Sequence, residues 1–173
     1  MVVAAIACTL ALTAQTKSSG AAAQVDRGKE LFVNSPKGPP CGGCHQIGGV
    51  GTAVGPDLKV FVSAVGPRAI AESIEMSMTA YVQQVKTADS TFPGFVQKKT
   101  ADEVDVWDLS KTPPELRKLA PKDIVSMENN TTWKHPPAAA GYSSQELVDV
   151  ISFLKYSATG TRNEIKASEV GDE

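Results

Sequence analysis

Cys41 and Cys44 are separated by two glycines and followed at once by His45. A Cys-x-x-Cys-His sequence is typical of covalent c-type haem attachment. Each thiol can add across one vinyl group of the porphyrin, and this spacing matches two vinyl groups along one helical turn. His45 then lies where its imidazole can bind the iron as the proximal ligand. The motif therefore predicts one covalently bound haem c.

Three other sites can use such a cysteine pair: a disulfide, a thioredoxin-like redox pair and half of a zinc site. A thioredoxin motif opens the helix of a βαβ unit, whereas this one follows Pro39-Pro40 and precedes a glycine-rich loop. Zinc takes four ligands, which the two cysteines and the two histidines of the chain, His45 and His135, could supply. Adjacent Cys44 and His45 would be strained in one tetrahedron, so haem attachment is the favoured interpretation.

Two helices are expected around this motif. The first is short and starts near Asp26, a good N-cap residue, with Gly28 and Phe32 on one face. The second starts at Gly66-Pro67 and runs to about Met76, with proline in its first turn.

A third helix is expected near the C-terminus. Ser143 and Glu146 fit a capping box, apolar residues recur at helical spacing as far as Ala158, and Gly160 is a natural stop. The polar and acidic residues 161–173 are expected to form a flexible tail.

The central part of the chain has the pattern of β-strands. Four short segments rich in β-branched and aromatic residues are separated by turn residues, at 81–87, 92–98, 103–109 and 124–127. They predict a small antiparallel insert over about residues 79–128. In one segment Val104 and Val106 alternate with other residues, which gives a face expected to pack on the haem domain.

The order of these features resembles class I cytochromes c and, more closely, a bacterial family of haem-binding domains that carry a β-rich insert. Gly28 to Phe32 resembles the face of the N-terminal helix that crosses the C-terminal helix in these proteins. Gly55-Pro56-Asp57-Leu58 resembles the turn whose proline carbonyl accepts a hydrogen bond from the proximal histidine, which implies that Pro56 orients His45. The resemblance implies a mainly α class I cytochrome c fold over residues 24–160, with a small antiparallel insert.

The second axial ligand departs from the family pattern. The family usually has a Met-Pro pair shortly before the last helix, but the corresponding segment here contains His135-Pro136 and no methionine. Proline restricts the residue before it to extended backbone, so a ligand at position 135 lies on a stiff loop. Ligation by His45 and His135 is therefore expected. Met127, eight residues earlier, is the alternative ligand, and an open sixth position is the third possibility.

Two axial ligands leave no vacant iron position for a substrate, which predicts an electron carrier and not an enzyme. Its partners would be redox proteins such as a dehydrogenase or another cytochrome, and bis-histidine ligation would give a low potential. The alternatives are a five-coordinate haem peroxidase or small-gas sensor, and an electron-exit module of a secreted dehydrogenase complex.

Composition and the N-terminus indicate where the protein works. The 173 residues include 17 basic and 19 acidic side chains, a balance that argues against nucleic acid as a partner. Residues 1–23 combine an apolar run with Ala21-Ala22-Ala23, which predicts a signal peptide, although no Lys or Arg precedes the run. No apolar run reaches the roughly 20 residues that span a bilayer. We therefore expect a periplasmic or otherwise exported bacterial protein with no membrane span after cleavage.

Overall fold

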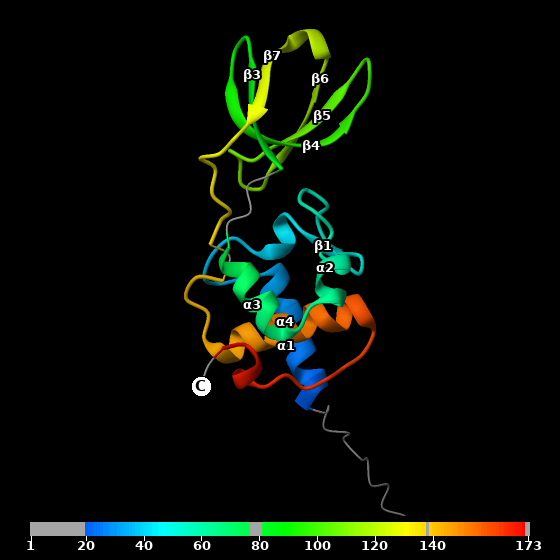
Figure 1. Ribbon diagram of the computed structural model, residues 1–173, viewed down its shortest axis with the longest axis vertical. Helices are drawn as coiled ribbons and strands as arrows, with labels where there is room; N and C mark the ends of the chain where they lie inside the picture. Colours follow the sequence, from blue (N-terminus) through cyan, green and yellow to red (C-terminus); the bar gives the residue numbers. More distant parts are fainter. Residues whose placement is uncertain (1–19, 77–80, 138, 172–173) are drawn as a thin grey trace, which may run out of the picture.

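Helices and strands lie in two separate lobes of the chain (Figure 1). The computed structural model describes residues 20–76, 81–137 and 139–171. Most of the predicted signal peptide, residues 1–19, lies outside the described residues. Its Ala21-Ala22-Ala23 segment belongs to the first turn of helix α1, and Ala21 is buried.

The lower lobe consists of helices and short turns. Its elements are α1 (Gly20–Val33), η1 (Cys41–Gly43), β1 (Gln46–Ile47), β2 (Val50–Gly51), α2 (Lys59–Ala64), α3 (Pro67–Glu75), α4 (Ser144–Thr159) and η3 (Ala167–Glu169). Helices α1 and α4 cross and make the largest contact between elements of this lobe. Phe32 of α1 and Phe153 of α4 meet in its core, with ring centroids 5.2 Å apart.

The last helix has the ends that its sequence predicts. The Ser143 hydroxyl accepts a hydrogen bond from the Glu146 amide, and the Glu146 carboxylate accepts one from the Ser143 amide. Gly160 ends the helix with a left-handed backbone, φ 75°, which glycine adopts without steric cost. The capping box and the glycine stop are confirmed.

The first helix starts earlier than expected. Asp26 does not cap it but lies in its second turn, because α1 begins at Gly20. Gln24, two residues before Asp26, donates from Nε2 to the Ile165 carbonyl and accepts from the Ile165 amide at Oε1. These bonds and the burial of Ala21 extend the helix beyond its local cap signal.

The upper lobe is a five-stranded antiparallel sheet. Its strands are β3 (Val82–Thr87), β4 (Thr91–Lys99), β5 (Val104–Asp108), β6 (Glu115–Leu119) and β7 (Ile124–Asn129), in the spatial order β6-β5-β4-β3-β7, and η2 (Pro121–Asp123) precedes β7. Strands lie in all four of the segments that the sequence indicates, and β6 is the fifth.

This sheet overturns the expected mainly α fold class. The described residues hold four α-helices beside a five-stranded sheet and the β1–β2 hairpin. The physical reason is that the insert has a core of its own, formed by Val85, Phe92, Val104 and Val106. The expectation that Val104 and Val106 pack on the haem domain is therefore wrong, because these side chains complete the sheet's own core.

Residues 161–171 also differ from the flexible tail that was expected. Ile165 and Val170 are buried in the core of the helical lobe, and η3 lies between them. The Gln24 side chain bonds both backbone groups of Ile165. No helix within the described ranges is long and apolar enough to cross a membrane.

Candidate functional site

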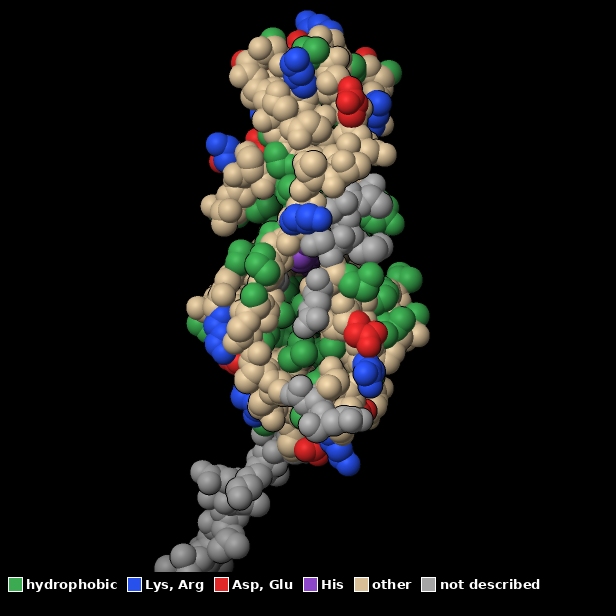
Figure 2. All heavy atoms as spheres, turned by 60° about the vertical axis from the view of Figure 1, so that its left-hand side comes forward, with side chains coloured by type: hydrophobic (Ala, Val, Ile, Leu, Met, Phe, Trp, Pro, Cys, Tyr) green, Lys and Arg blue, Asp and Glu red, His purple; other side chains and the backbone are tan. Residues whose placement is uncertain are grey.

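The candidate site lies where the two lobes meet. Figure 2 shows a histidine side chain in a hollow at this level, with hydrophobic side chains gathered below it. The hollow is lined by parts of the chain far apart in sequence, since the Cys-Gly-Gly-Cys-His segment and the loop that carries His135 both reach it.

Cys41 begins the short turn η1 and Cys44 directly follows it, with both thiols free and partly buried. The amides of Cys44 and His45 both donate to the Cys41 carbonyl, at 3.1 and 2.8 Å. Burial raises the pKa of both thiols. A thioredoxin-like pair requires a lowered thiol pKa, so the raised pKa of both thiols opposes that alternative. Within the described part of the chain no group of three His, Cys, Asp or Glu side chains could hold a metal ion, which opposes the zinc alternative.

The glycine-rich segment after the motif forms a tight hairpin. Gly48 and Gly49 connect β1 to β2 with φ angles of 56° and 80°, the positive values that two-residue hairpin turns require. After the hairpin, the amides of Thr52 and Gly55 donate to the carbonyls of Gly42 and Cys44, at 2.9 and 2.7 Å. The hairpin therefore returns the chain across η1 and brings Pro56 to His45.

His45 has the hydrogen bond that the sequence led us to expect. Its Nδ1 lies 2.9 Å from the Pro56 carbonyl oxygen. A carbonyl only accepts, so Nδ1 carries the proton and the lone pair of Nε2 is free to bind a metal. Burial has the largest effect on the pKa of His45 and lowers it, the hydrogen bond to Pro56 raises it, and His135 lowers it. The net lowering of the pKa favours the neutral imidazole, which is the form that binds metals.

Gly55 is a site residue that sequence reasoning missed. A Cβ at this position would lie 2.8 Å from His45 Cε1 and 3.1 Å from Nδ1. The ring can therefore keep its bond to Pro56 only if residue 55 has no side chain. The Gly55-Pro56 pair contains the signal, because a glycine next to a turn proline allows a close approach of the backbone.

His135 faces His45 across the hollow. The two ring centroids are 5.9 Å apart, and the ring planes are inclined by 28°. Trp133 stands edge-on to His135, with centroids 6.2 Å apart and planes at 83°. The only two histidines of the chain, 90 positions apart in sequence, are thus brought together.

Met127, the alternative ligand, belongs to the sheet. It lies on β7 opposite Val85 of β3 and packs on the apolar core of the sheet. The structure thus brings His135 to His45, while the Met127 side chain takes part in the packing of the other lobe.

Comparison with known proteins identifies the family. The family model described as Cytochrome c matches residues 25–111, which is half of the chain. The match begins in α1, includes the Cys-Gly-Gly-Cys-His motif and the Pro56 turn, and ends after β5. No curated protein matches the chain. The chain belongs to the cytochrome c family and is a haem-containing electron-transfer protein.

Proposed function

We propose that this protein is a monohaem c-type cytochrome that carries single electrons between redox proteins outside the cytoplasm. The haem would be attached through Cys41 and Cys44 and held axially by His45 and His135. The observation that carries the proposal is the facing pair of imidazoles, 5.9 Å apart.

This separation fits one metal ion between the two rings. Metal–imidazole bonds are about 2.0–2.1 Å long in zinc sites, and the ring centroid lies about 1 Å behind the nitrogen, so rings on opposite sides of an ion have centroids about 6 Å apart. The observed 5.9 Å agrees with that value. His45 Nδ1 is engaged by Pro56, so Nε2 is the nitrogen left for the metal.

The chain's own residues would restrict the site to electron transfer. When bound, haem supplies a one-electron Fe(III)/Fe(II) couple. His45 is fixed by the Pro56 carbonyl, and His135 is fixed by a stiff X-Pro backbone. If His45 and His135 both held the haem iron, no iron position would be open for peroxide or a gas. Two imidazoles also favour the ferric state more than an imidazole and a thioether do, so we expect a low potential.

The partners and the location follow from the same chemistry. Thioether bonds keep the cofactor attached where free haem would be lost, as in the periplasm. We expect the donor or acceptor to be a dehydrogenase or another cytochrome, which would contact the haem edge through a small transient interface. A signal peptide at residues 1–23 would direct the export.

Low-temperature EPR with near-infrared magnetic circular dichroism tests the ligand set. The oxidised holoprotein should give a low-spin bis-imidazole signal. In His135→Ala that signal should disappear, and in Met127→Leu, the matched control, it should remain. A thioether signal lost in Met127→Leu would identify methionine as the ligand. A high-spin wild type would instead support the five-coordinate peroxidase or sensor.

A further inference from the structure

The segment that carries His135 leaves the sheet at Asn130, directly after the end of β7 at Asn129. In Figure 1 the chain runs from the sheet down the side of the helical lobe to α4. Only four residues separate Asn130 from His135. Whatever fixes the backbone at Asn130 therefore restricts where the His135 ring can lie.

Asn130 is fixed by an unusually complete set of hydrogen bonds. The residue is 8% exposed. Its Oδ1 accepts from the Trp133 amide at 2.8 Å, and from the Thr132 amide and hydroxyl at 3.1 and 3.0 Å. Its Nδ2 donates to Gln84 Oε1 at 2.8 Å, and its amide donates to the Val82 carbonyl at 2.9 Å. One side chain thus closes the turn before Trp133 and ties that turn to β3.

The turn is continuous with the two imidazoles. Trp133, whose amide is held by Asn130, presents its indole edge-on to the His135 ring, and that ring faces His45. A chain of contacts therefore leads from Gln84 on β3 to the candidate axial pair.

We infer that Asn130 is a positioning residue for His135, and that the sheet is the scaffold on which the distal ligand is mounted. The inference rests on the proposed bis-histidine site. The Oδ1 acceptor sets the turn, and the Nδ2 donor fastens the turn to β3. This role also accounts for the Asn130-Thr131-Thr132 sequence, which matches a glycosylation sequon. Here the amide is buried and used in bonding within the protein.

The chemistry of the side chain suggests a discriminating pair of variants. Asn130→Ala removes both the acceptor and the donor. Asn130→Asp keeps the acceptor, and Gln84 can rotate its amide to donate to the new carboxylate. Asn163→Ala, at an exposed asparagine in the C-terminal segment, is the matched control.

The experiment measures spin state and carbon monoxide binding in holoprotein of these variants and of His135→Ala. Carbon monoxide binds ferrous haem only when the sixth coordination position is free. The rate of carbon monoxide binding therefore measures how firmly the protein keeps His135 on the iron. In Asn130→Ala we expect about tenfold faster binding and a high-spin fraction in the ferric EPR spectrum. Asn130→Asp and Asn163→Ala should remain close to the wild type.

Two results would overturn the inference: wild-type rates and spectra in Asn130→Ala, or equal impairment in the Asp and Ala variants. If Asn130→Ala gives no folded holoprotein, Gln84→Leu replaces it, because this change removes only the side-chain hydrogen bond between Asn130 and β3. Faster binding in Gln84→Leu would support the inference, and an unchanged rate would overturn it. His135→Ala separates the two proposals, since an unaltered rate in that variant would refute the axial role of His135 itself.

Discussion

Gly28 of α1 lies against the main chain of Asp149 in α4, so closely that a Cβ at position 28 would come within 1.8 Å of the Asp149 carbonyl oxygen. The two helices can cross only if residue 28 has no side chain. Gly28→Ala should therefore force them apart and destabilise the protein by about 3 kcal/mol. Urea unfolding followed by far-UV circular dichroism measures the change. Gly66→Ala is the control, because nothing lies within 4 Å of its Cβ position, and it should cost less than about 1 kcal/mol.

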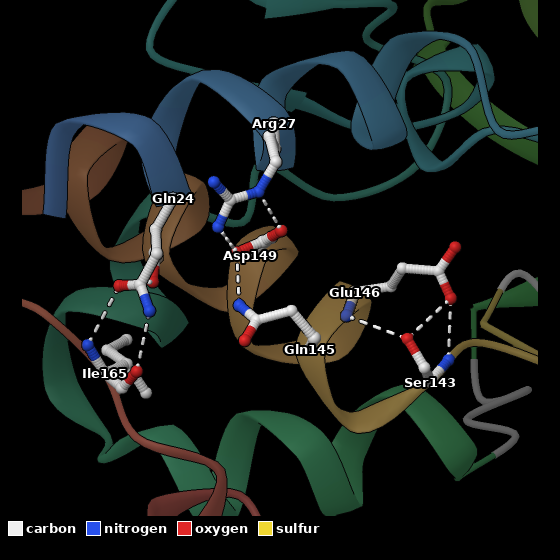
Figure 3. Close-up of polar contacts among 8 residues, drawn as sticks. Gln24, Arg27, Ser143, Gln145, Glu146, Asp149 and Ile165 are labelled. Carbon is white, nitrogen blue, oxygen red and sulfur yellow. Dashed lines mark hydrogen bonds and ion pairs between the residues drawn. The ribbon is translucent and has the colours of Figure 1, made fainter. Parts of the chain in front are cut away.

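Asp149 is also held by its side chain at this crossing (Figure 3). The carboxylate, 4% exposed, accepts two hydrogen bonds from Arg27, at 2.6 and 2.7 Å, and one from Gln145. Arg27 itself is half exposed, which weakens the pair through solvent screening. A double-mutant cycle with Arg27→Met and Asp149→Asn should give a coupling energy of about 1–2 kcal/mol.

The control cycle uses Arg68 and Glu72, an exposed pair one turn apart on α3. Its coupling energy should not exceed about 0.5 kcal/mol. Equal coupling energies in the two cycles would show that burial of the Asp149 carboxylate does not strengthen its interaction with Arg27.

Glu146 at the start of α4 makes the free energy of unfolding depend on pH in the acid range. Hydrogen bonds from Lys37 and Ser143 lower the pKa of Glu146 to about 2. Because this pKa is below the unfolded value of about 4.3, the stabilisation is present at neutral pH and is lost as pH falls from about 5 toward 2. Urea midpoints measured across this range should fall less steeply in Glu146→Gln than in the wild type. Glu128→Gln, on the exposed side of β7, should follow the wild-type curve.

Features with a local physical cause were predictable from the sequence. The ends of α4 follow from Ser143, Glu146 and Gly160, all within or next to the helix. The contact of His45 with Pro56, 11 residues further on, was implied by the resemblance of Gly55-Pro56-Asp57-Leu58 to a family motif, and that motif is itself short. In both cases the interacting groups are close in sequence, so a short window contains the whole signal.

Features that depend on distant partners were not predictable. The start of α1 and the packing of the C-terminal segment depend on the same contact. It joins Gln24 and Ile165, which are 141 residues apart. Strand β6 has a charged sequence with little β character, and it is held by pairing with β5 and by Lys118 against Asp105. The role of Asn130 was hidden for the same reason, because its partner Gln84 lies on another strand.

Gly55 leaves the space that the His45 imidazole occupies. In Gly55→Ala the new methyl group would meet His45 Cε1 at 2.8 Å, so the ring must tilt or lose its bond to Pro56. We expect shifted ferric EPR g-values and a changed midpoint potential in holoprotein that remains folded. Gly66→Ala should match the wild type in both measurements. An unchanged spectrum in Gly55→Ala would mean that the loop, not the ring, moves to make room.

With the proposed bis-histidine site, the separate cores of the two lobes predict that His135 leaves the iron before the helical lobe unfolds. Val106 is fully buried in the sheet core, while Val148 is buried in the helical core. Val106→Ala should destabilise the sheet by roughly 2 kcal/mol. Since His135 follows the sheet through Asn130, heating this variant should convert low-spin to high-spin haem at a lower temperature than in the wild type. The helical circular dichroism at 222 nm should melt as before.

Val148→Ala is the matched control for that experiment, because it makes the same change in the other core. It should lower the melting temperature of the helical signal. If Val106→Ala shifts the spin-state and helical transitions together by the same amount, the two lobes unfold as one cooperative unit. If the spin-state transition separates from the helical transition only in Val106→Ala, the stability of the sheet keeps His135 on the iron. A destabilised sheet would then release His135 from the iron while the haem stays attached.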